Sequence, residues 1–175
     1  MKLEKISMLC GIVVMILLAF LIIWQADILG VSAGRLEEDA RENQQIDSDW
    51  KVVQGMNEDM CAMLFYDEDK DSCAYSIYLT REGFSFGYFF GKGGTDAYMR
   101  DNVEAVVFED MGIALLSLNQ DKVCKIVIGD EAEENVIQVN PEEPFAIILP
   151  IDCGEITMYD AQESVVTLYD TYTGV

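Results

Sequence analysis

The apolar and polar positions of this chain follow three successive patterns. Residues Ile6 to Ala26 form one uninterrupted apolar run without a charged side chain. Residues 27–49 are mostly polar and rich in helix-forming side chains. From Trp50 onward, short apolar segments alternate with polar residues at a period of two, which is typical of β-strands. The pattern therefore predicts an apolar helix, a polar connection and a β domain.

The apolar run has the length of a membrane-spanning helix. A helix rises about 1.5 Å per residue, so about 20 residues cross a hydrocarbon core of about 30 Å. Lys2 and Lys5 precede the run, and Trp24 lies near its far end, where an aromatic anchor at the membrane interface is expected. These features predict a short cytoplasmic tail at residues 1–5 and a single-pass signal-anchor at residues 6–26 that inserts into the lipid bilayer of the cell membrane. The rest of the chain is then expected outside the cell.

A cleaved signal peptide is the alternative to this anchor. Val31, Ser32 and Ala33 resemble a small-residue cleavage site, and cleavage after Ala33 would release the chain from the membrane. The apolar core is longer than the roughly 7–15 residues of a signal peptide. That length favours the uncleaved anchor.

Beyond the apolar run, the pattern predicts a stalk and one β domain. Residues 27–49 are expected to form a polar stalk, helical or flexible. Residues 50–175 contain short apolar segments separated by Gly, Asn, Asp or Pro, and the segments Cys61–Tyr66 and Cys73–Thr80 predict a hairpin. Residues 96–107 are the best place for a short helix. The expected fold is an antiparallel β-sandwich, with a partly open β-barrel as the alternative.

Charge narrows the classes of partner. The chain has 175 residues with 11 basic and 32 acidic side chains, which gives a net charge of −21 at pH 7. Lys2, Glu4 and Lys5 are the only charged side chains before Asp27, so the acidic excess lies in the predicted stalk and β domain. A negative field repels phosphates and attracts cations. We therefore expect no nucleic-acid partner.

The absence of histidine limits catalysis. It removes Ser-His-Asp and Cys-His arrangements and imidazole ligands for metals. A pair of carboxylates could hydrolyse a glycosidic bond, but with 32 acidic residues some pair always lies close, so the sequence identifies none. The sequence favours a non-enzymatic binding, assembly or accessory module of the cell envelope with a protein or glycan partner. A carboxylate-based envelope hydrolase is the alternative.

One acidic segment has part of a calcium-binding pattern. Asp67, Asp69 and Asp71 alternate as in the opening of a calcium loop. Ser72 stands where that loop needs glycine, and Tyr78 stands where a bidentate glutamate would close the shell. A polar hairpin turn is therefore favoured, and a weak divalent-cation site is the alternative. No other cofactor is expected.

Aromatic side chains gather between positions 75 and 90. If the segment alternates as a strand, its inward face carries Phe84, Phe86, Tyr88 and Phe90. Phe89 is then expected to point outward. An exposed aromatic beside glycine could bind a sugar or a peptide, so the candidate binding residues are Tyr78, Phe89 and Lys92.

Four cysteines fall within the predicted β domain: Cys61, Cys73, Cys124 and Cys153. Outside the membrane they permit disulfides in three pairings, with Cys61 and Cys73 closest in sequence. Cys124 and Cys153 alternate in phase with their apolar neighbours, so both are expected to face the core. The sequence leaves their oxidation state open.

Overall fold

In the computed structural model, the chain forms an all-β domain with a helix on its outer surface. The structure describes residues 11–18, 28–83, 85–95, 99, 102–129 and 135–173. Residues 11–18 are helical, and a short 3-10 helix, η1 (Ala33–Arg35), leads into α2 (Leu36–Gln44). The strands are β1 (Lys51–Met56), β2 (Met60–Tyr66), β3 (Cys73–Leu79), β4 (Phe89–Gly94), β5 (Val103–Phe108), β6 (Gly112–Ser117), β7 (Val123–Ile128), β8 (Val136–Gln138), β9 (Phe145–Leu149), β10 (Ile156–Asp160), β11 (Val165–Val166) and β12 (Leu168–Thr173).

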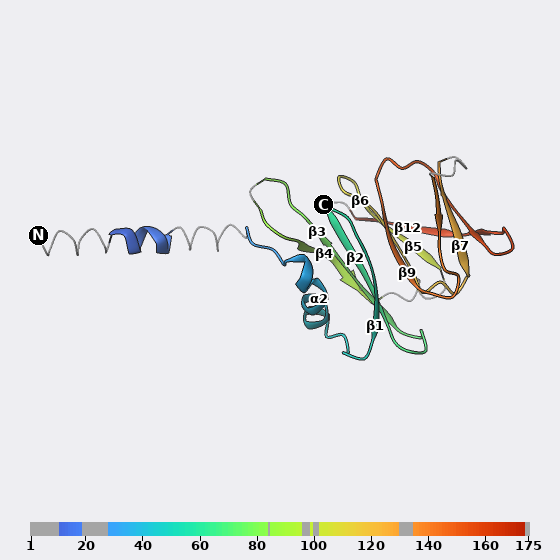
Figure 1. Cartoon of the computed structure of the whole chain (residues 1–175), viewed down its shortest axis with the longest axis horizontal. Helices are drawn as coiled ribbons and strands as arrows, with labels where there is room; N and C mark the ends of the chain where they lie inside the picture. The colour runs from blue at the N-terminus through green and yellow to red at the C-terminus, as the bar shows by residue number, and fades with distance from the viewer. Residues whose placement is uncertain are drawn as a thin grey trace, which may run out of the picture.

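These strands form three four-stranded sheets that stack in layers (Figure 1). The helix-side sheet has the order β1-β2-β3-β4, the central sheet β12-β5-β6-β9 and the outer sheet β11-β10-β7-β8. Neighbouring described strands are antiparallel except β12 and β5, which are parallel. The predicted all-β domain is confirmed, and so is the predicted hairpin, which is β2 and β3.

Two apolar cores lie on the two faces of the central sheet. The first packs residues such as Leu64 against Leu116, and the second packs residues such as Leu115 against Ile126. Every residue of β5 and β6 is buried, because the central sheet has an apolar layer on each side. Val103–Phe108 therefore forms a strand, which corrects the later part of the short helix expected at residues 96–107. Met99 is helical, and residues 96–98, 100 and 101 lie outside the described residues.

The helix α2 packs on the domain. Leu36 and Ala40 are fully buried, in one cluster with side chains of the helix-side sheet. Acidic residues in the first turn favour the helix electrostatically. The helix ends at Gln44 and is capped by Gln45, whose φ of 56° is left-handed. Arg41 holds the following turn by donating to the carbonyl oxygens of Asp47 and Trp50, both at 2.9 Å. This part of residues 27–49 differs from the expected stalk, because its apolar stripe is covered by the sheet.

Most of the predicted membrane span lies outside the described residues. Residues 11–18 are helical and exposed. Within the part of the chain that the structure describes, no helix is long and apolar enough to cross a membrane. The span at residues 6–26 stays a prediction.

The aromatic segment faces the opposite way from the expected one. Phe89 lies opposite Leu79, which faces the first core, and Phe89 is only 8% exposed. Phe90 lies on the α2 side of the sheet and is 50% exposed, and Phe86 is 57% exposed. The predicted outward orientation of Phe89 and the inward orientation of Phe86 and Phe90 are therefore wrong. Phe84 is outside the described residues, and Tyr88 is partly buried against the cluster under α2.

A β-bulge changes the orientation of Cys124. Lys125 pairs with Tyr159 and Val123 with Asp160, so Cys124 is the extra residue on β7. A bulge interrupts the alternation of side chains. As a result Val123 is buried while Cys124 is only half-buried, and the expectation that Cys124 faces the core is not met.

The four cysteines of the domain are free thiols. Cys61 pairs with Tyr78 and Cys73 with Tyr66, at opposite ends of the β2–β3 hairpin. Five strand positions correspond to about 16 Å, whereas a disulfide needs Cα atoms within about 7 Å. Cys61 and Cys73 therefore cannot bridge in this fold. Cys153 is partly buried against the second core.

Candidate functional site

Asp67, Asp69 and Asp71 lie in the turn between β2 and β3. The Asp67 Oδ1 accepts a hydrogen bond from the Asp71 N–H at 2.8 Å, and the Asp67 N–H donates to the Ser72 carbonyl oxygen at 3.2 Å. Asp67 is thus used to stabilise the turn itself. Among the described residues, no three acidic or thiol side chains come together to hold a metal ion. The structure does not gather the three carboxylates into one shell.

Lys70 of this turn and Lys122 of the loop between β6 and β7 both bind Glu142. Lys70 Nζ donates to the Glu142 carbonyl oxygen at 3.0 Å, and Lys122 Nζ donates to Glu142 Oε2 at 2.8 Å. The hydrogen bond and the charge of Lys122 lower the pKa of Glu142. Both members of the Lys122–Glu142 pair are exposed, so the pair adds little stability.

Tyr78 is fully buried between the helix-side sheet and α2. Its hydroxyl donates to Asp39 Oδ2 at 2.6 Å, and Asn43 Nδ2 donates to the same oxygen at 2.9 Å. Burial raises the pKa of Tyr78, and the hydrogen bond to Asp39 raises it further. Gln44 Nε2 donates to Ser76 Oγ. These contacts join the helix to the sheet.

Phe89 and Lys92 lie on the opposite face of the helix-side sheet from Tyr78. Phe89 pairs with Leu79 and Lys92 with Ile77, and both partners face the first core. Directly opposite residues of antiparallel strands share a face. The structure therefore does not bring the three predicted binding residues together on one surface.

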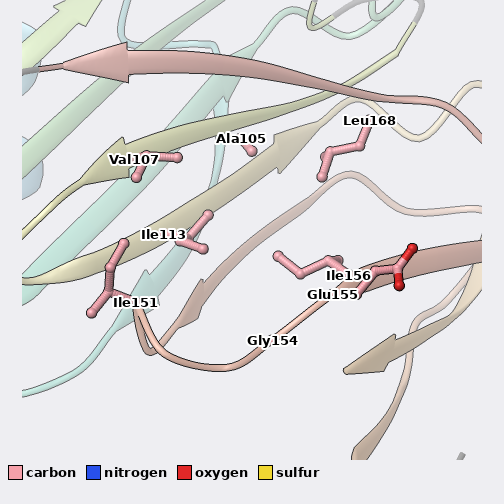
Figure 2. A pocket seen from close by; sticks show the side chains of 8 residues that line it. All are labelled: Ala105, Val107, Ile113, Ile151, Gly154, Glu155, Ile156 and Leu168. Carbon is pink, nitrogen blue, oxygen red and sulfur yellow. The ribbon is translucent and has the colours of Figure 1, made fainter. Parts of the chain in front are cut away.

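An apolar cavity of about 370 Å³ lies between the central and outer sheets (Figure 2). Its lining consists of Ala105, Val107, Ile113, Ile151, Gly154, Glu155, Ile156 and Leu168. Figure 2 shows the Ile151 side chain at one end and the Glu155 carboxylate at the other. The cavity is thus an aliphatic surface with one carboxylate at its edge.

Among the described residues, Glu155 is the single carboxylate in this lining. Glu104, next to Ala105 on β5, is 3% exposed but lies opposite Leu116, which faces the first core. Alternation along β5 therefore places Glu104 on the face away from the cavity. An apolar cavity with one carboxylate can receive an apolar group attached to a cation.

Sequence patterns did not predict this cavity, because its lining comes from strands that are far apart in the sequence. Ile151 directly follows Pro150 in a turn that continues to Gly154, and it is 41% exposed.

Burial raises the pKa of the Cys61 thiol from its ordinary value of 9.0 to about 11. The folded state thus favours the neutral thiol, and its contribution to stability is complete below pH 9.0 and is lost as the pH rises to about 11. We expect the free energy of unfolding to fall over this interval, and to fall less in Cys61→Ala. Urea denaturation of both proteins at pH 8 and pH 10.5 measures the difference. Equal losses in the two proteins would contradict the assignment to Cys61.

Comparisons with known proteins add no family to this geometry. No family model, no curated protein and no solved structure matches the chain. The function proposed below therefore rests on the residues and contacts of the chain itself.

Proposed function

We propose that the chain is a membrane-anchored binding module of the cell envelope, with residues 6–26 in the bilayer and the acidic β domain outside the cytoplasm. The three-sheet stack is then an extended antiparallel β-sandwich that carries its binding surface on a rigid scaffold. The observation that supports this function best is the apolar cavity between the central and outer sheets, with Glu155 at its edge.

The position of the cavity suits a tethered protein. The described domain begins at residue 28 beside the helix-side sheet, while the cavity lies between the two sheets farthest from α2 (Figure 1). Residue 28, where the described domain begins, and the cavity thus lie on opposite sides of the central sheet. A partner approaching from outside the membrane reaches the cavity without passing the bilayer.

The lining defines the class of ligand. A volume of about 370 Å³ is near the lower end of ligand pockets, which span about 300–1,000 Å³. The aliphatic side chains favour an apolar group, and Glu155 favours a positive charge beside it. The net charge of −21 attracts the same ligands over longer distances. The ligand is then an apolar group next to a cation, such as an aliphatic side chain adjacent to lysine or arginine in a partner protein.

Octylammonium serves as the probe for this function. In the full chain reconstituted in nanodiscs, we expect it to shift the δ1-methyl NMR signals of Ile113, Ile151 and Ile156. Ile77 in the first core serves as the internal control. Glu155→Gln is expected to weaken binding about threefold, because Glu155 is exposed and an exposed charge pair contributes a few tenths to 1 kcal/mol.

Octanol is the matched uncharged probe, and it should bind the native protein and Glu155→Gln equally. The cavity function fails if the three lining isoleucines do not shift. It also fails if Ile77 shifts as much as they do, since the probe would then be acting on the whole domain. Loss of nanodisc incorporation would contradict the anchor separately.

A further inference from the structure

The first described residues of the domain are fixed to the loop before β4. The Gly30 N–H donates to the Phe86 carbonyl oxygen and the Val31 N–H to the Tyr88 carbonyl oxygen, both at 2.7 Å. In return the Phe86 N–H donates to Ile28 O at 2.9 Å and the Tyr88 N–H to Val31 O at 2.8 Å. These four hydrogen bonds hold residues 28–31 against residues 86–88.

Two glycines make this close approach feasible. A Cβ on Gly30 would lie 2.5 Å from the Tyr88 carbonyl oxygen, and one on Gly87 would lie 2.7 Å from the Val31 carbonyl oxygen. Gly87 also has a φ of +88°, a backbone conformation that residues with a side chain rarely adopt. Each of the two segments therefore carries a glycine at the position where the close contact requires one.

The contact presents two large apolar side chains to solvent. Leu29 and Phe86 are bridge partners, and they are 65% and 57% exposed. Bridge partners point to the same side, so the two side chains form one apolar surface, here called the Leu29–Phe86 patch. Contiguous exposed apolar side chains are the kind of surface that protein or membrane contacts cover.

We infer that the Leu29–Phe86 patch inserts into the outer interface of the bilayer; this inference rests on the proposed anchor at residues 6–26. Three residue steps separate Ala26 from Leu29, so Leu29 lies within about 11 Å of the end of the span. The headgroup layer on each side of the hydrocarbon core is about 5–8 Å thick. The anchor thus brings the patch to the depth at which apolar side chains gain from burial in lipid. The patch then acts as a second membrane contact that fixes the orientation of the domain and keeps the cavity away from the bilayer.

The test uses tryptophan fluorescence of the full chain in phosphatidylcholine vesicles with brominated acyl chains. Trp24 and Trp50 are replaced by Phe, and a new tryptophan is introduced by Phe86→Trp or, as a second position on the patch, Leu29→Trp. Phe90→Trp is the matched control, because Phe90 is 50% exposed but lies on the α2 side of β4. We expect bromolipid to quench the two patch variants at least about twofold more than Phe90→Trp.

Flotation of the vesicles separates this inference from the anchor. Protein that floats while all three variants are quenched equally would overturn the membrane contact and leave the anchor intact. Protein that does not float would overturn both. Unchanged thermal melting of the variants excludes misfolding as the cause of either result.

Discussion

Replacing Leu36 by alanine is expected to lower the free energy of unfolding of the domain by about 3 kcal/mol. Leu36 is the first residue of α2 and is fully buried in the cluster that joins the helix to β2 and β3. Truncation to alanine leaves a cavity within the cluster that Leu36 forms with Cys61, Met63, Phe65 and Tyr78. The sheet residues are held by their strand pairing, so they do not move in to fill this cavity. Urea denaturation of the detergent-solubilised chain, followed by circular dichroism, measures the change.

Glu38→Ala is the matched control on the same helix. Glu38 is exposed, and its side chain pairs with the exposed Arg35 at 3.1 Å. We expect this change to cost less than about 0.5 kcal/mol. Equal effects of Leu36→Ala and Glu38→Ala would show that α2 does not contribute to the stability of the domain. The segment would then behave as the stalk that the sequence suggested.

The fold class could be predicted because strand alternation is a local property. The β2–β3 hairpin illustrates this, because two apolar segments flank the acidic turn at residues 67–71. The residue types of the turn are enough to indicate where the first strand ends and the second begins. The division into three sheets is not local. The fully buried strands Val103–Phe108 and Gly112–Ser117 indicate a sheet covered on both faces, yet the sequence does not say which strands cover it.

The candidate site was much less predictable than the fold. The exposure of Phe89 and Phe90 depends on which residue of β3 each one faces, and this register is set by the tertiary fold. Tyr78 shows the same limit, because the sequence did not indicate that α2 would cover it. The cavity requires β5, β6, β12 and the loop before β10 to meet, so no local pattern could reveal it.

Asn119→Ala is expected to cost about 4 kcal/mol, because Asn119 connects the central and outer sheets. Asn119 is 2% exposed in the loop between β6 and β7. Its side chain donates to the Val123 carbonyl oxygen at 3.1 Å and to the Asn140 carbonyl oxygen at 3.0 Å, and it accepts the Val123 N–H at 2.7 Å. Three hydrogen bonds of about 1 kcal/mol each are lost, and the backbone groups of Val123 and Asn140 that bound the side chain stay without water.

The backbone of Asn119 adds the rest of this cost. Its φ of 57° is left-handed, a conformation that costs alanine about 1 kcal/mol or more. Asn119→Gly loses the same three hydrogen bonds without this strain, so it should be about 1 kcal/mol less destabilising than Asn119→Ala. Gln120→Ala, an exposed change at the next position, should be nearly neutral. Urea denaturation of the three variants tests this order, and an Asn119→Ala effect as small as that of Gln120→Ala would contradict it. If the order holds, the junction that positions the outer sheet over the cavity depends on one asparagine side chain.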